Sequence, residues 1–257
     1  MLRRYGSLDE LGRAAAEEVV RAAGDAVAAR GRFTLALAGG ETPRGLYRLL
    51  ASPPYRARVD WSRAELFWGD ERAVPPGDPG SNYRLAAEAL LGPLALPERL
   101  VHRIQAEEGA EAAEAAAARY ERELARAFGV APGGPPPAFD LVLLGMGPDG
   151  HVASLFPGSP ALEERRRWAV PAEGPPPWPA RVTLTLPVLN AARRVLVLVA
   201  GSRKAEALAR VREGPRESRR LPAQLLEDEL ERVTWLVDEA AAARLGPPDP
   251  PDARSRA

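Results

Sequence analysis

A histidine and an aspartate stand two residues apart in a glycine-rich segment that follows a short apolar run. The run, Val-Leu-Leu at residues 142–144, is typical of a strand covered on both faces. Asp149 and His151 come soon after it, at the carboxyl end of the predicted strand, where open α/β sheets place their ligands. Histidine exchanges protons near neutral pH, and a neighbouring carboxylate can hold its ring in one orientation. The spacing therefore predicts that His151, oriented by Asp149, acts as a general base.

The glycines of the same segment supply room and backbone donors. Gly147 and Gly150 let the chain turn sharply. We expect N–H groups around them, or a helix start beside them, to hold the negative oxygen of a tetrahedral intermediate. In an alternative interpretation, Asp-Gly is only a common turn pair and the histidine caps the next helix. The glycines also match the dinucleotide pattern G-x-G-x-x-G, but Pro157 and Pro160 would stop the long helix that such a site needs. The position at a strand end favours the general base.

A second glycine turn has the features of an anion site. Gly39 and Gly40 follow a predicted buried strand at residues 33–37, and Thr42 opens a predicted helix. Free N–H groups at a helix N-terminus bind anions, and the Thr42 hydroxyl adds another donor. The lysine and the spacing of a P-loop are missing. The turn would otherwise serve only the tight connection between strand and helix.

Three cations stand in turns or at strand ends. Arg72 follows the predicted strand 65–68 and can offer a planar fork to phosphate or carboxylate oxygens. Lys204 is the only lysine in the chain and lies three residues beyond a strand that ends near Gly201. Arg181 begins another strand. We predict that all three bind substrate, although a surface ion pair for Arg72 and a solvated Lys204 are the alternatives.

Composition excludes several classes of protein. The formal net charge of the 257 residues is zero, so neither a nucleic acid nor a membrane surface is indicated as a partner. No apolar run approaches the ~18 residues of a membrane span, and the start lacks a secretory signal. The chain has no cysteine and two histidines, a poor set of zinc ligands. We expect a cytoplasmic protein that uses neither a metal nor another cofactor.

Alternation of strands, glycine turns and helices predicts an α/β fold, a three-layer, doubly wound and mostly parallel sheet. The first helix should run over residues 7–29, with Ser7 as N-cap and Glu10 completing a capping box. We expect one domain at residues 1–245 and a flexible tail at 246–257, with proline-rich surface loops at 131–137 and 174–179. The remaining expected elements are strands at 140–145, 195–199 and 233–237 and helices at 42–50, 81–91 and 106–128.

Four blocks of sequence resemble the 6-phosphogluconolactonases of the glucosamine-6-phosphate isomerase/6-phosphogluconolactonase family. They are Gly-Gly-x-Thr-Pro at 39–43, Asp-Glu-Arg-x-Val at 70–74 with Ser-Asn at 81–82, the segment 140–158, and Arg-x-Thr at 181–183 with Gly-x-x-Lys at 201–204. The resemblance covers essentially the whole chain and implies a fold shared with glucosamine-6-phosphate deaminases and ribose-phosphate isomerases. Ala38 and Glu41 depart from the serines that the family usually has, so Glu41 must point away from any bound phosphate.

The resemblance implies hydrolysis of 6-phosphoglucono-δ-lactone to 6-phosphogluconate in the oxidative pentose phosphate pathway. A sugar phosphate would be the only ligand, and the protein would be a monomer or a small homo-oligomer. An amino-sugar phosphate isomerase or deaminase and a non-catalytic sugar-phosphate sensor are the alternatives. A covalent nucleophile at Ser154 would lack the G-x-S-x-G elbow. Which cation binds phosphate and which binds the carbonyl stays open.

Overall fold

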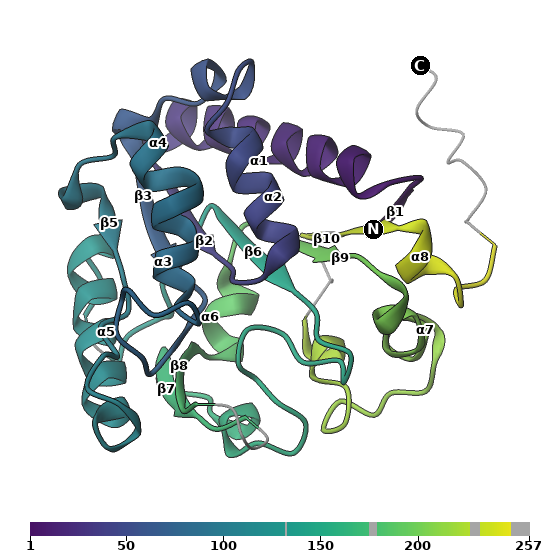
Figure 1. Ribbon diagram of the computed structural model, residues 1–257. Coiled ribbons are helices and arrows are strands. Elements are labelled where there is room, and N and C mark those ends of the chain that lie inside the picture. The colour runs from purple at the N-terminus through teal and green to yellow at the C-terminus, as the bar shows by residue number, and fades with distance from the viewer. Residues whose placement is uncertain (132, 175–178, 227–231, 248–257) are drawn as a thin grey trace.

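Seven parallel strands form the central sheet of the molecule (Figure 1). The computed structural model describes residues 1–131, 133–174, 179–226 and 232–247. Within these residues the strands lie in the order β1-β10-β9-β6-β2-β3-β5. Their bounds are β1 Leu2–Tyr5, β2 Phe33–Leu37, β3 Ala64–Trp68, β5 Val101–His102, β6 Leu141–Gly145, β9 Val195–Val199 and β10 Val233–Asp238.

Helices cover both faces of this sheet (Figure 1). α1 packs against α2 and α2 against α3, whereas α5 packs near the carboxyl end of β3. Right-handed crossovers explain why the helices divide between the two faces of the sheet. From β2 the chain proceeds to β3 and β5 on one side of the sheet, and from β6 it proceeds to β9 and β10 on the other side. The bounds are α1 Leu8–Arg30, α2 Glu41–Leu50, α3 Asn82–Ala86, α4 Gly92–Leu94, α5 Ala113–Phe128, α6 Leu186–Ala191, α7 Ala205–Glu213 and α8 Glu239–Ala242.

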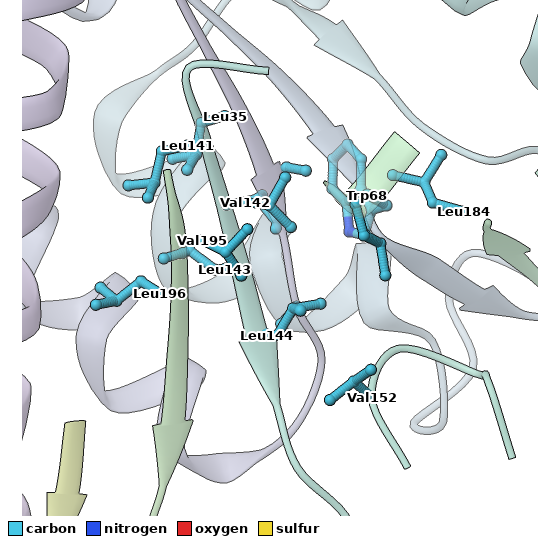
Figure 2. Close-up of a cluster of buried hydrophobic side chains, with 14 of the residues drawn as sticks. Leu35, Trp68, Leu141, Val142, Leu143, Leu144, Val152, Leu184, Val195 and Leu196 are labelled. Atoms are coloured by element: carbon cyan, nitrogen blue, oxygen red, sulfur yellow. The ribbon is translucent and has the colours of Figure 1, made fainter. Parts of the chain in front are cut away.

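The hydrophobic core lies around β6, the middle strand (Figure 2). All five residues of β2 and of β9 are buried, as are the first four of β6. Leu35 of β2 pairs with Leu141 of β6, and Val195 of β9 pairs with Val142. A strand without polar alternation must be covered on both faces, and this packing satisfies that need.

Asp140 fixes the register of β6 against β2. Its buried carboxylate accepts hydrogen bonds from the backbone N–H and the hydroxyl of Thr34, both at 2.9 Å, and from Arg30 Nε at 2.9 Å. Because a shift of one residue would turn every side chain of the strand to the other face, this anchor also determines where the loop after β6 begins.

A second, antiparallel sheet was not expected from the sequence. It has the order β4-β8-β7, with β4 at Asp70–Arg72, β7 at Ala169–Ala172 and β8 at Arg181–Leu184. Arg72 lies opposite Arg181, and Asp70 lies opposite Thr183. The strand that begins at Arg181 was expected, but β4 and β7 have only three and four residues, too few to show a period in the sequence.

Most of the expected elements of the central sheet are present. Strands were expected at 33–37, 65–68, 140–145, 195–199 and 233–237, and each lies within two residues of its predicted bounds. The first helix begins as expected, because Ser7 Oγ accepts a hydrogen bond from the Glu10 N–H at 3.2 Å. The Glu10 carboxylate, however, accepts from Gly6 N–H and not from Ser7 N–H.

Some expectations were wrong, and others concern residues that the structure does not describe. The helix predicted for 106–128 begins only at Ala113, after a 3₁₀ turn, because Gly109 has a φ of 86° and cannot continue a right-handed helix. Short strands β1 and β5 were missed. Most of the predicted tail and most of the proline loop at 174–179 lie outside the described residues, and the single domain at 1–245 stays a prediction. No described helix has both the length and the apolar character that crossing a bilayer requires.

Candidate functional site

A cavity of about 360 Å³ opens at the carboxyl ends of β2, β3, β6 and β9. The strand order reverses between β2 and β6, and open α/β sheets bind ligands at such a switch point. The cavity brings together most residues that the sequence predicted for the site. The polar and glycine residues in its wall include Gly39, Gly40, Asp70, Arg72, Asn82, Gly147, His151, Arg181, Arg203 and Lys204.

A larger cavity, of about 650 Å³, lies beside β5 and α5. His102 and Tyr120 are among its lining residues, but none of the predicted site residues is. It also lies away from the switch point, so the smaller cavity is the better candidate for chemistry.

Asp149 holds the imidazole of His151 in one orientation. Asp149 Oδ1 lies 2.6 Å from His151 Nδ1 and also accepts from the His151 backbone N–H at 3.2 Å. Burial alone would raise the pKa of Asp149, but the hydrogen bond and the charge of the ring outweigh it, and the pKa lies below its usual range. An ionised Asp149 accepts a hydrogen bond from Nδ1–H, which leaves Nε2 as the nitrogen that can take a proton.

Gly147 makes room for this pair. A Cβ at this position would lie 2.2 Å from both Cε1 and Nδ1 of His151 and 2.6 Å from Asp149 Oδ1. Only glycine therefore lets the imidazole lie this close to the backbone of the turn. Gly150 has a φ of 80°, and a Cβ there would meet Leu221 at 2.9 Å. Both glycines are required by the geometry of the loop.

The expected role of these glycines as oxyanion donors is not supported. Gly147 N–H donates to the carbonyl of His151 at 2.9 Å, and Gly150 N–H donates to the carbonyl of Gly147 at 3.0 Å. Both groups are used inside the turn, and Gly150 is not among the cavity-lining residues. An oxyanion needs donors that are still available when it forms.

The first glycine turn lies in the cavity wall only in part: Gly39 and Gly40 line the cavity, as predicted, and Thr42 does not. Gly39 packs against Asn82, whose Oδ1 would lie 1.8 Å from a Cβ, and Gly40 has a φ of 104°. Thr42 is half-buried and does not line the cavity. Glu41 is 83% exposed and pairs with Arg44 at 3.4 Å, so its carboxylate points away from the cavity, as expected.

Lys204 lies at the start of α7, in the cavity wall. Burial lowers the pKa of Lys204, Asp238 opposes this shift in part, and Arg203 adds to it. Asp238 accepts from Gly201 N–H at 3.0 Å and from Ala241 N–H at 2.7 Å, which fixes the turn that carries the lysine. Arg203 was not predicted as a site residue. The signal available in the sequence was its position next to Lys204, in a turn that follows a strand.

Arg72 and Arg181 enter the cavity from the second sheet. Arg72 is half-buried, and its Nη1 donates to the carbonyl of Gly80 at 2.5 Å. Arg181 is only 3% exposed, and burial lowers its pKa, although the nearby Asp70 opposes that shift. Arg181 Nη1 lies 3.6 Å from Asp70 Oδ2.

A buried polar network around Asp70 was missed by the sequence reasoning. Ser154 is fully buried and donates to Asp70 Oδ2 at 2.5 Å, and Asn82 Nδ2 donates to the Asp70 carbonyl at 2.9 Å. A buried hydroxyl committed to a carboxylate is poorly placed for attack on a substrate, so the geometry speaks against a nucleophilic Ser154. Asp70 and Asn82 stood in blocks that the sequence singled out, but the contact of Asp70 with Ser154 spans 84 residues and leaves no local pattern.

Phe156 joins the two halves of the site. Its ring centre lies 4.7 Å from that of His151 and 5.4 Å from the guanidinium carbon of Arg181. The ring is 4% exposed. His151 and the buried Arg181 therefore both lie beside the same apolar ring.

The dinucleotide interpretation does not fit the structure, because no helix follows Gly150. Within the described ranges, no three histidine, aspartate or glutamate side chains gather as metal ligands would. The use of no metal or other cofactor stays a prediction.

Known proteins share this sequence and fold. The family described as "Glucosamine-6-phosphate isomerases/6-phosphogluconolactonase" matches residues 6–235. The chain is 43% identical to the 6-phosphogluconolactonase of Streptomyces coelicolor over 235 residues, which cover 90% of this chain and 89% of that one. The solved 6-phosphogluconolactonase of Trypanosoma cruzi is 31% identical, with a TM-score of 0.85 over 96% of this chain and 97% of that one.

A monomeric glucosamine-6-phosphate deaminase of known structure shares the fold at 24% identity, with a TM-score of 0.76 over 95% of this chain and 99% of that one. The expected likeness to deaminases is therefore confirmed for the fold, whereas that to ribose-phosphate isomerases stays a prediction. The chain belongs to the glucosamine-6-phosphate isomerase/6-phosphogluconolactonase family.

Proposed function

We propose that this protein hydrolyses 6-phosphoglucono-δ-lactone to 6-phosphogluconate, a step of the oxidative pentose phosphate pathway. Relatives with high coverage carry the name 6-phosphogluconolactonase. The observation that carries the proposal is the pairing of an oriented base with cations in one cavity, where His151 and Lys204 line the same wall. One base and one water suffice for a lactone, whereas isomerisation needs carboxylates around the sugar. Asp70 is the one carboxylate among the described lining residues, and Ser154 already donates to it.

The reaction proceeds through a tetrahedral intermediate. His151 Nε2 takes a proton from a water molecule as the water oxygen bonds to the lactone carbonyl carbon. The carbonyl π electrons move onto its oxygen, which becomes an oxyanion. When the carbonyl re-forms, the bond to the ring oxygen breaks and that oxygen receives the proton from His151. The acid product then ionises to 6-phosphogluconate.

Magnitudes support a mechanism without a covalent intermediate. General-base assistance gives about 10²–10⁴-fold, and a donor to the oxyanion about 10²–10³-fold. Six-membered lactones also hydrolyse in water without an enzyme. Lys204, Arg72 and Arg181, with the turn of Gly39 and Gly40, would bind the phosphate and the carbonyl oxygen. Thr42 does not line the cavity and would contribute only through the backbone.

The test uses one preparation in two assays. Wild-type protein should consume 6-phosphoglucono-δ-lactone well above the spontaneous rate and should not deaminate glucosamine 6-phosphate. His151→Asn should lose hydrolysis by about 10²–10⁴-fold while it still binds 6-phosphogluconate. His102→Gln, a change in the only other histidine, is the matched control and should keep its activity.

Three results would contradict the proposal. Hydrolysis by His151→Asn within a few fold of wild type would remove the assigned base. Deamination would favour the isomerase branch of the family. Tight binding of 6-phosphogluconate with no turnover would favour a sugar-phosphate sensor. We also expect the protein to work in the cytoplasm, as a monomer or small homo-oligomer.

A further inference from the structure

The buried guanidinium of Arg181 has a different environment from Lys204 and Arg203, two other cations of the cavity. We infer that Arg181 donates to the lactone carbonyl oxygen and stabilises the oxyanion, that Asp70 and Ser154 position it, and that Lys204 and Arg203 bind the phosphate. This inference rests on the proposed lactone hydrolysis and adds the orientation of the substrate.

The first support is the distance between Arg181 and the base. Both groups lie about 5 Å from the centre of the Phe156 ring, which limits their separation to about 10 Å. In the reacting complex, His151 Nε2 would contact a water molecule, the water would contact the carbonyl group, and the carbonyl oxygen would accept a hydrogen bond from Arg181. This line of contacts spans several ångströms, since each hydrogen bond adds about 2.8 Å. The two residues are thus close enough to act on opposite sides of one carbonyl.

The second support is charge. Among the described residues, neither Lys204 nor Arg203 forms an ion pair with a carboxylate, and both lie in the first turn before α7. Unpaired cations beside a helix N-terminus suit the double charge of a phosphate. Arg181 has Asp70 beside it, at 3.6 Å, so much of its charge is already balanced. A balanced and rigid donor suits the single charge that develops on a carbonyl oxygen.

The third support is rigidity. Asp70 Oδ2 accepts from Ser154 Oγ at 2.5 Å, and Asp70 Oδ1 accepts from Asn82 Nδ2 at 3.3 Å. Ser154 Oγ also lies 3.5 Å from Arg181 Nη1. These groups are all buried, so the guanidinium is held in one position before the substrate arrives. Ser154 acts through Asp70 and is a positioning residue.

The same assignment fills a gap left by the glycine loop. Because Gly147 and Gly150 use their N–H groups inside the turn, the oxyanion needs another donor. Arg181 lines the cavity and lies beside the Phe156 ring, which also lies beside His151.

The experiment separates the two ends of the substrate with glucitol 6-phosphate, which has the phosphate but no carbonyl. Arg181→Lys keeps the charge and loses the planar fork. We expect kcat to fall about 10²–10³-fold while the Kd for glucitol 6-phosphate stays within three-fold of wild type. Lys204→Gln should do the reverse and weaken glucitol 6-phosphate at least ten-fold with a smaller loss of kcat.

Removing Arg181 could unfold the protein by leaving Asp70 buried and unpaired. The double variant Asp70→Asn/Arg181→Gln keeps the site neutral and should show the same loss of kcat and the same retained Kd. If either Arg181 variant weakened glucitol 6-phosphate ten-fold, or kept kcat within three-fold of wild type, the inference would be overturned. Absence of hydrolysis by wild-type protein would instead overturn the proposed function, so the two failures are distinguishable.

A double-mutant cycle tests the role of Ser154. Ser154→Ala should lower kcat about ten-fold in the wild-type background and less than two-fold in the Arg181→Lys background, because the serine acts on a fork that the lysine lacks. Equal losses in both backgrounds would show that Ser154 is only structural and would overturn its assignment as a positioning residue.

Discussion

Arg72 and Arg181 lie directly opposite each other in the antiparallel strands β4 and β8, and both line one cavity. Like charges at facing positions destabilise a sheet by about 0.2–1 kcal/mol. Asp70, two residues before Arg72 on the same face, forms an ion pair with Arg181, whereas no carboxylate in the described part of the chain forms one with Arg72. The arrangement costs stability in the free protein and becomes favourable when an anion enters.

Arg72→Gln should therefore weaken ligand binding without loss of stability. We expect the free energy of unfolding to stay equal to that of wild type or to rise by up to about 1 kcal/mol. The Kd for 6-phosphogluconate should rise about ten-fold, because one cation is removed. Urea unfolding and calorimetric titration measure the two effects, with Arg63→Gln on the surface as control. A clear loss of stability would show that Arg72 is structural.

Gly147→Ala should inactivate the protein without unfolding it. Gly147 is not in the left-handed region, so the backbone accepts alanine, but the new Cβ would displace the His151 ring. We expect kcat to fall about 10²–10⁴-fold, with the free energy of unfolding within about 1 kcal/mol of wild type. Gly45→Ala, in α2 with nothing near its Cβ, is the matched control. Activity near wild type would mean that catalysis does not require the position of the His151 ring beside Gly147.

The lowered pKa of Lys204 predicts weaker binding in alkali. As the pH rises through this pKa, the ammonium loses its charge at a lower pH than an ordinary lysine would, near ~10.4. A phosphate monoester keeps its double charge throughout this range. The Kd for 6-phosphogluconate should therefore begin to increase in wild type at a lower pH than the ~10.4 of an ordinary lysine, and should stay constant in Lys204→Arg, because arginine remains charged. The same alkaline weakening in both proteins would exclude Lys204 as its source.

His102 predicts a pH dependence of stability away from the site. His102 Nδ1 lies 2.6 Å from Glu123, and Nε2 lies 3.5 Å from Glu65. Burial alone would lower the pKa of His102, but these carboxylates outweigh it and raise the pKa above its usual range. Its contribution is thus fully present below the unfolded pKa, near ~6.5, and is lost as the pH rises through the folded pKa.

Urea unfolding between about pH 5.5 and 9 measures this contribution. The free energy of unfolding should fall by about 1.4 kcal/mol for each pH unit between the two pKa values in wild type. The pKa values of Glu65 and Glu123 are lowered, so their own contributions are constant in this range. His102→Gln should lack this fall. An equally steep fall in His102→Gln would assign the dependence to another group.

The sequence predicted the edge of the sheet where the site lies, because buried parallel strands are short apolar runs that end in glycine. It also predicted the partnership of Asp149 and His151, which are two residues apart. It could not predict the contact of Asp70 with Ser154, since that contact depends on how distant segments pack. Gly147 and Gly150 are not supported as oxyanion donors, because a sequence shows where N–H groups are, but not which of them the turn itself uses.

The strand order has a consequence for how the protein matures. The two strands at the switch point, β2 and β6, are about 100 residues apart in the chain, and Lys204 follows a third strand, β9. A growing polypeptide that has just completed Asp149 and His151 still lacks Arg181, Lys204 and the neighbour that flanks β6. Ribosome-bound intermediates should therefore stay inert until β9 has emerged, and refolding chains should recover helical signal before they recover turnover.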